Sequence, residues 1–226
     1  MKLKKLLGPS VVLAMTAQLA MAGLVSYNDN NAYTGHMGRD AKVKIHFDGS
    51  PVNHRTIDAG EMFVGYDATG TGDNYIETAV FCSDVTAYLT GRAYQVTETS
   101  PFDFAGERGQ KAAWLASNNY SDTMTDAQAA GLQVALWEII HEDSGNPFSA
   151  SKGDFRITNV YGNDIISIAD SYLESLEGLN DFSGSDGIFL AAEGRQDLLI
   201  VPEPVTICLL AAGGAMFLKK RKSSVK

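Results

Sequence analysis

Two residues of this sequence could react with each other, Cys82 and Gln133. A cysteine thiolate can attack the carboxamide carbon of a glutamine, expel ammonia and leave an internal thioester. Such a bond stores an acyl electrophile, which an amine or a hydroxyl on another molecule can open to form a covalent link. The bond also needs shielding from water, and Trp137, one helical turn beyond Gln133, is suited to form a pocket wall.

The segment around Gln133, residues 125–145, carries the strongest helix signal of the chain. Thr125 can act as N-cap, Gln128 completes a capping box, and Gly145 is typical of a helix end. Because this helix is apolar at nearly every position, we expect the carboxamide of Gln133 to be at least half buried. A buried carboxamide needs hydrogen-bond partners, since an unmet one costs about 1–3 kcal/mol.

The best strand signal covers residues 75–86 and places Cys82 near the strand end. Alternation puts Cys82 on the same face as Val80, and Phe81 on the other face. We expect Phe81, next to the thiol in sequence, to contribute to the pocket wall together with Trp137.

The first 22 residues are typical of a secretory signal peptide. Three lysines precede an apolar run over residues 6–19, and the run is followed by Ala20-Met21-Ala22. The alternative, an N-terminal membrane anchor, fits less well because the run is short and interrupted. The sequence therefore predicts export.

Residues 202–226 have three parts in order: Pro202-Glu203-Pro204, an uncharged stretch over 205–218 and a basic cluster over 219–222. This arrangement resembles the PEP-CTERM sorting tail of Gram-negative bacteria. The resemblance implies an exosortase-type enzyme that processes the chain near Pro204, a transient inner-membrane anchor, and a final place at the cell surface or in the extracellular matrix. An ordinary tail anchor is the alternative, and it also leaves the domain outside the cytoplasm.

The mature domain is then expected to span residues 23–201, enough for one good core. Without the two ends, 10 Lys and Arg stand against 26 Asp and Glu, a net charge of −16, which argues against nucleic-acid binding. Cys208 lies in the tail, so Cys82 is the lone cysteine of this domain. A lone thiol in an oxidising compartment calls for a chemical explanation.

The order of the predicted elements favours an α+β fold: a β-sandwich or barrel-like body with a helical insertion of about three helices between residues 110 and 178. We expect loops over residues 23–40 and 148–162. The predicted strands are 42–47, one or two pieces within 57–66, 75–86, 94–99, 187–191 and 197–201, and the predicted helices are 110–118, 125–145 and a third from Asn163 to Gly178.

Two motifs resemble the bacterial thioester domains of surface adhesins. Phe81-Cys82 is similar to their cysteine motif, and the glutamine motif corresponds to Leu132-Gln133-Val134-Ala135-Leu136-Trp137. The similarity covers about residues 76–141. It implies that Cys82 and Gln133 are thioester partners. From the chemistry of that bond we expect a single-turnover acyl transfer at most, not an enzyme, to an amine or hydroxyl on a surface or matrix target that the sequence does not name.

Two other classes of function stay open. Cys82, His141 and Asn146 follow one another in the Cys-His-Asn order that the catalytic residues of some cysteine hydrolases have along the chain. A noncovalent matrix or surface-binding protein is the third class. The sequence has no zinc-ligand spacing, no EF-hand loop and no phosphate-binding loop, so we expect neither a metal nor a cofactor.

Overall fold

The computed structural model describes residues 22–27, 35–48, 50, 54–87, 89, 91–142, 145–160, 164–185 and 187–201. The predicted signal peptide up to residue 21 and the predicted sorting tail with Pro202, Glu203 and Pro204 lie outside the described residues. None of the helices in the described ranges is long and apolar enough to cross a lipid bilayer.

A closed antiparallel barrel of six strands forms the body of the protein. The strands lie in the order β1-β5-β7-β8-β4-β3, and pairing between β1 and β3 closes the ring. β2 continues the sheet beyond β3, and β6 pairs with the outer edge of β2. The strands are β1 (Ala22–Ser26), β2 (His36–Phe47), β3 (Thr56–Asp67), β4 (Ile76–Cys82), β5 (Tyr94–Thr99), β6 (Phe155–Val160), β7 (Ile188–Ala191) and β8 (Leu198–Ile200).

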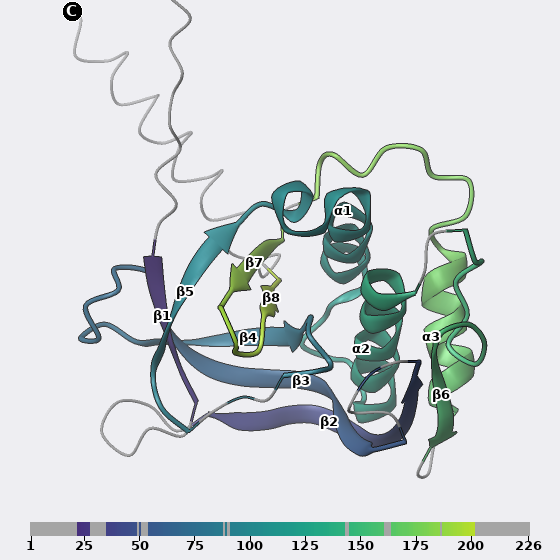
Figure 1. Ribbon diagram of the computed structural model, residues 1–226, viewed down its shortest axis with the longest axis horizontal. Helices are drawn as coiled ribbons and strands as arrows, with labels where there is room; N and C mark the ends of the chain where they lie inside the picture. Colours follow the sequence, from purple (N-terminus) through teal and green to yellow (C-terminus); the bar gives the residue numbers. More distant parts are fainter. Residues whose placement is uncertain are drawn as a thin grey trace, which may run out of the picture.

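Three helices pack at one end of this barrel: α1 (Pro101–Asn119), α2 (Asp126–His141) and α3 (Ile165–Glu174). Figure 1 shows α2 between the barrel strands on the left and α3 on the right, with α1 above it. α2 contacts both other helices and also β2, β3, β4 and β6. Helix α2 is thus the central element that joins the helical layer to the barrel.

The sequence around α2 explains both its start and its burial. The Thr125 hydroxyl accepts a hydrogen bond from the Gln128 backbone N–H (3.3 Å), and Gln128 Oε1 accepts one from the Thr125 N–H (2.8 Å), so the predicted capping box is confirmed. Every residue from 129 to 139 is buried, because the helix has neighbours on all sides. The helix ends at His141, with Glu142 as C-cap, four residues before the predicted end at Gly145.

The predicted class, an α+β fold with a barrel-like body and a helical insertion, is confirmed, but several boundaries are wrong. α1 begins at Pro101 instead of residue 110, because Ser100 caps it by accepting from the Asp103 N–H (3.2 Å) and the helix continues across a break at Ala105 and Gly106. The third helix begins at Ile165 after Asp164 and ends at Glu174; the predicted cap Asn163 lies outside the described residues.

Two predicted loops contain strands. Residues 23–40 hold most of β1 and the start of β2, and residues 148–162 hold β6. β1 is only five residues long but pairs with β3 and β5, so partners distant in sequence stabilise it. Of the one or two strand pieces predicted around Gly60, the structure has one, β3. β3 runs through this glycine, whose φ of +149° accommodates the irregular register opposite Asp40.

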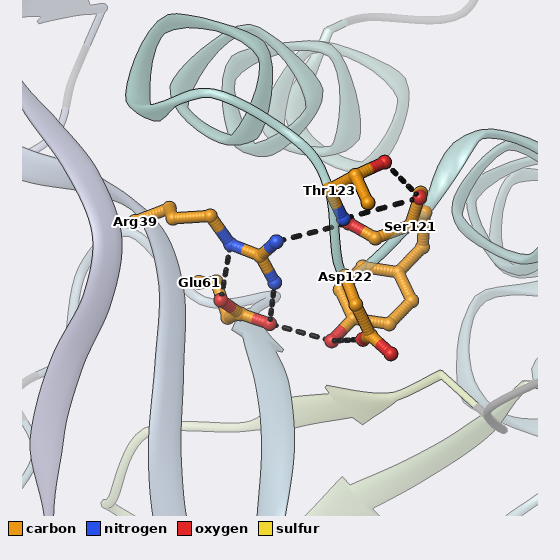
Figure 2. A network of polar contacts seen from close by, with 6 residues as sticks. Arg39, Glu61, Ser121, Asp122 and Thr123 are labelled. Atoms are coloured by element: carbon orange, nitrogen blue, oxygen red, sulfur yellow. Dashed lines mark hydrogen bonds and ion pairs between the residues drawn. The ribbon is translucent and has the colours of Figure 1, made fainter.

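An ion pair between β2 and β3 holds the segment between α1 and α2 against the barrel (Figure 2). Arg39 of β2 holds both carboxylate oxygens of Glu61 of β3, with Nη2–Oε1 and Nε–Oε2 distances of 2.7 and 2.8 Å. The hydroxyl of Tyr120, just after α1, donates to Glu61 Oε1 (2.6 Å), and Arg39 Nη1 donates to the Ser121 carbonyl (3.1 Å). Because Glu61 is 1% exposed, these partners keep a buried charge satisfied and fix the α1–α2 connection.

Replacement of Gly131 should disturb the packing of α2 against α3. A Cβ at this position would lie 2.5 Å from Ile168 Cγ2 and 3.0 Å from Ile168 Cβ. We expect Gly131→Ala to lower the free energy of unfolding by about 1–3 kcal/mol in urea titrations, despite the better helix propensity of alanine. Gly184→Ala, where a Cβ meets nothing within 4 Å, is the control and should change stability by less than about 0.5 kcal/mol. Equal stabilities for the two variants would contradict this account of the contact.

Candidate functional site

The carboxamide of Gln133 and the backbone of Cys82 form two reciprocal hydrogen bonds. The Cys82 N–H donates to Gln133 Oε1 (2.9 Å), and Gln133 Nε2 donates to the Cys82 carbonyl (2.7 Å). Both residues are buried, with exposed fractions of 4% and 1%. The two residues, 51 positions apart in sequence, are therefore in direct contact.

The end of β4 explains why a glutamine fits here. The described pairing of β3 with β4 stops at Met62 opposite Val80, whereas the pairing of β4 with β8 continues to Cys82 opposite Leu198. The Cys82 N–H and C=O pair with the side chain of Gln133 in the way that a neighbouring strand would pair. Figure 1 shows the arrowhead of β4 directed toward the helices.

The thiol of Cys82 has its own set of polar neighbours. It donates to the Asp84 carbonyl (3.0 Å), and Gln196 Nε2 donates to Sγ. Burial raises the pKa of the Cys82 thiol to about 12, while the side chains of Trp137 and Gln196 oppose this rise. The Trp137 Nε1–H is buried without an ordinary hydrogen-bond partner, and the Trp137 side chain lowers the pKa of the thiol.

A pocket of about 350 Å³ contains these groups in its wall. Cys82, Gln133, Trp137 and Gln196 all line it. Much of the rest is apolar and comes from β2, β3 and the segment after β4: Met37, Ile57, Met62, Val85, Ala87 and Leu89. A small molecule or side chain that enters this pocket thus meets the cysteine and the glutamine together.

Phe81 occupies a different place from the one we expected. It is 1% exposed, does not line the pocket, and packs edge-on against Tyr120 with a centroid distance of 6.0 Å. The reason is the alternation of the strand, which directs consecutive side chains to opposite faces. Trp137, in contrast, both lines the pocket and is 2% exposed.

His141 and Asn146 do not form a relay with Cys82. His141 Nε2 lies 3.0 Å from the Ser83 carbonyl, and its ring packs against Phe47 and Phe155. Asn146 instead donates to Glu142 Oε1 (2.6 Å). Burial lowers the pKa of His141, so the imidazole is neutral at neutral pH. The side chains of Cys82, His141 and Asn146 therefore do not form the hydrogen-bonded chain that a cysteine hydrolase would need.

Gln196 is the site residue that sequence reasoning missed. It lies between β7 and β8, 114 residues from Cys82, and reaches the sulfur only because β8 pairs with β4. Nothing in the local sequence around Gln196 marks it as a partner of a thiol. Its place depends on the closure of the barrel.

No family model, curated protein or solved structure matches this chain. Within the described ranges, no group of three or more His, Cys, Asp or Glu side chains could hold a metal ion.

Glu138, directly after Trp137 on α2, should make stability depend on pH. Its Oε1 accepts from the Ser149 N–H (2.8 Å), but Oε2 is buried without a partner. Burial, with a smaller contribution from Glu142 and Asp170, raises the pKa of Glu138 from 4.5 to about 8. The folded state therefore retains a proton that the unfolded state releases, and stability falls as the pH rises from about 4.5 to about 8.

The variant Glu138→Gln should flatten this part of the pH profile, because a neutral amide of the same shape has no proton to lose. We expect the variant to gain stability relative to the wild type by a few kcal/mol between about pH 5 and pH 8, measured by urea unfolding at each pH. Glu174→Gln, at an exposed position of α3, is the matched control. A Glu138→Gln profile parallel to that of the wild type would show that Glu138 is ionised in the folded protein.

Proposed function

We propose that this is an exported surface or matrix protein in which Cys82 and Gln133 form an internal thioester that attaches the protein covalently to an amine or hydroxyl on its target. The pair of hydrogen bonds between the Gln133 carboxamide and the Cys82 backbone, inside a pocket, is the observation that carries the proposal. It holds the Gln133 carboxamide against the backbone of the residue that carries the thiol, which lowers the entropic cost of their encounter.

The geometry suits the bond-forming step. Cys82 Sγ forms a bond to Gln133 Cδ, the bond from Cδ to Nε2 breaks, and ammonia leaves with the thiol proton. Negative charge develops on Gln133 Oε1 during this attack, and the Cys82 N–H already donates to that atom at 2.9 Å. A preorganised donor at a developing oxyanion is among the strongest aids to acyl transfer.

When the thioester opens, the Cys82 sulfur is the leaving group instead of the nucleophile. The nitrogen or oxygen of the target bonds to the acyl carbon, the bond to sulfur breaks, and the proton of the nucleophile ends on Sγ. The apolar lining from β2, β3 and the segment after β4 limits the competing attack by water. Each molecule transfers its acyl group once, so the proposed activity is attachment, not catalytic turnover.

The two ends of the chain support the proposed setting. Residues 1–22 are typical of an export signal, and residues 202–226 resemble a PEP-CTERM tail that an exosortase processes in Gram-negative bacteria. The motifs around Cys82 and Gln133 resemble those of bacterial thioester domains. We therefore propose a place at the cell surface or in the extracellular matrix, with a target that carries an accessible amine or hydroxyl.

Intact-mass spectrometry of the purified domain tests the proposal. We expect the wild-type mass to be lower than the sequence mass by one ammonia, and methylamine to add to the protein in a single step. Cys82→Ala and Gln133→Ala should each show their full calculated mass and no methylamine adduct. The control Gln95→Ala, at an exposed position of β5, should retain the deficit.

A wild-type protein of full mass, with Cys82 open to alkylation after unfolding, would contradict the thioester. The contact between Gln133 and Cys82 would then serve only to satisfy a buried carboxamide, and the protein would be a noncovalent surface or matrix protein.

A further inference from the structure

The sulfur of Cys82 has an N–H donor beside it that the contact with Gln133 does not involve. Gln196 Nε2 donates to Sγ, and the side chain of Trp137, whose Nε1–H is buried without an ordinary partner, lowers the pKa of the thiol. Both side chains line the pocket together with Cys82 and Gln133. Donors of this kind favour a sulfur that carries negative charge.

Several contacts hold Gln196 in this position. The Ser83 N–H, just after β4, donates to the Asp197 carbonyl (3.0 Å), and the Tyr94 hydroxyl donates to the Gln196 carbonyl (3.2 Å). Gln196 Nε2 also donates to the Asp84 carbonyl (3.2 Å), the group that accepts from the thiol. The turn between β7 and β8 is thus tied to the two residues that follow Cys82 and to β5.

We propose that Gln196 is a catalytic residue of the thioester reaction, which donates a hydrogen bond to Cys82 Sγ whenever that sulfur carries negative charge. This inference rests on the proposed function. In thioester formation the charged sulfur is the nucleophile that bonds to Gln133 Cδ while ammonia leaves. In opening by an amine it is the leaving group, which takes up the proton that the amine loses.

The chemistry of the pocket explains why a glutamine performs this task. A lysine or a histidine could also stabilise a thiolate, but each is a nucleophile that would attack the acyl carbon itself. The described residues that line the pocket include neither. A carboxamide and an indole supply N–H donors without competing for the acyl group. Gln196 and Trp137 therefore stabilise the sulfur and leave the electrophile for an outside amine or hydroxyl.

Removal of the Gln196 N–H donor should slow both the formation and the opening of the thioester. We expect Gln196→Leu to reduce the rate of thioester opening by methylamine about tenfold, followed by intact mass, because a hydrogen bond to a charged group is lost. Gln196→Glu keeps the size of the side chain but places a carboxylate beside the sulfur, and should slow opening at least as much. Gln95→Leu, exposed on β5, is the matched control and should react at the wild-type rate.

A second measurement separates this role from the thioester itself. In the Gln133→Ala background no thioester can form, so the rate at which iodoacetamide alkylates Cys82 at a fixed alkaline pH reports how readily the thiolate forms. Adding Gln196→Leu should slow this alkylation about tenfold, because the thiolate loses a hydrogen-bond donor. A side chain with only a structural role would leave the alkylation rate unchanged or raise it by exposing the thiol.

Failure of the thioester and failure of the role of Gln196 give different results. A full wild-type mass overturns the proposed function, whatever Gln196 does to the thiol. With the ammonia deficit present, an unchanged alkylation rate of Cys82 in Gln196→Leu and an unchanged methylamine rate in Gln196→Leu and Gln196→Glu overturn the role of Gln196 and leave the thioester standing.

Discussion

A buried carboxamide that pairs with the end of a strand is the constraint on which the site depends. Gln133 lies on a helix with neighbours on all sides, where water cannot satisfy its side chain, and the Cys82 peptide groups supply the missing partners. An unmet group at this depth would cost about 1–3 kcal/mol. The same two bonds fix α2 against β4 and hold the carboxamide against the Cys82 backbone, so in the proposed function packing and reactivity share one contact.

The surroundings of the Cys82 thiol shift its pKa in opposite directions. Burial raises the thiol pKa to about 12, which keeps Cys82 protonated at neutral pH. Gln196 and Trp137 oppose that rise, and in the proposed reaction they would favour the charged sulfur in the transition state more than in the ground state. A buried nucleophile beside fixed donors suits a reaction that happens once and whose product must then resist water.

Local signals in the sequence predicted the parts of this arrangement that local physics controls. Thr125 and Gln128 mark the start of α2, and the chemistry of a lone cysteine and a buried glutamine suggested their contact. The closure of the barrel could not be predicted in this way, because β1 is short and depends on distant partners. The same holds for β6, which pairs with the edge of β2. Gln196 was missed for the same reason. The place of Phe81 follows from strand alternation, so the error there was one of interpretation.

Peptide mapping of the native protein tests the central claim most directly. Digestion under mildly acidic conditions, followed by tandem mass spectrometry, should yield the peptide with Cys82 joined to the peptide with Gln133, together lighter by one ammonia. Treatment with methylamine before digestion should separate the two and place the methylamide on Gln133. Two separate peptides from the untreated protein, with an alkylated Cys82 and an intact Gln133 carboxamide, would contradict the account.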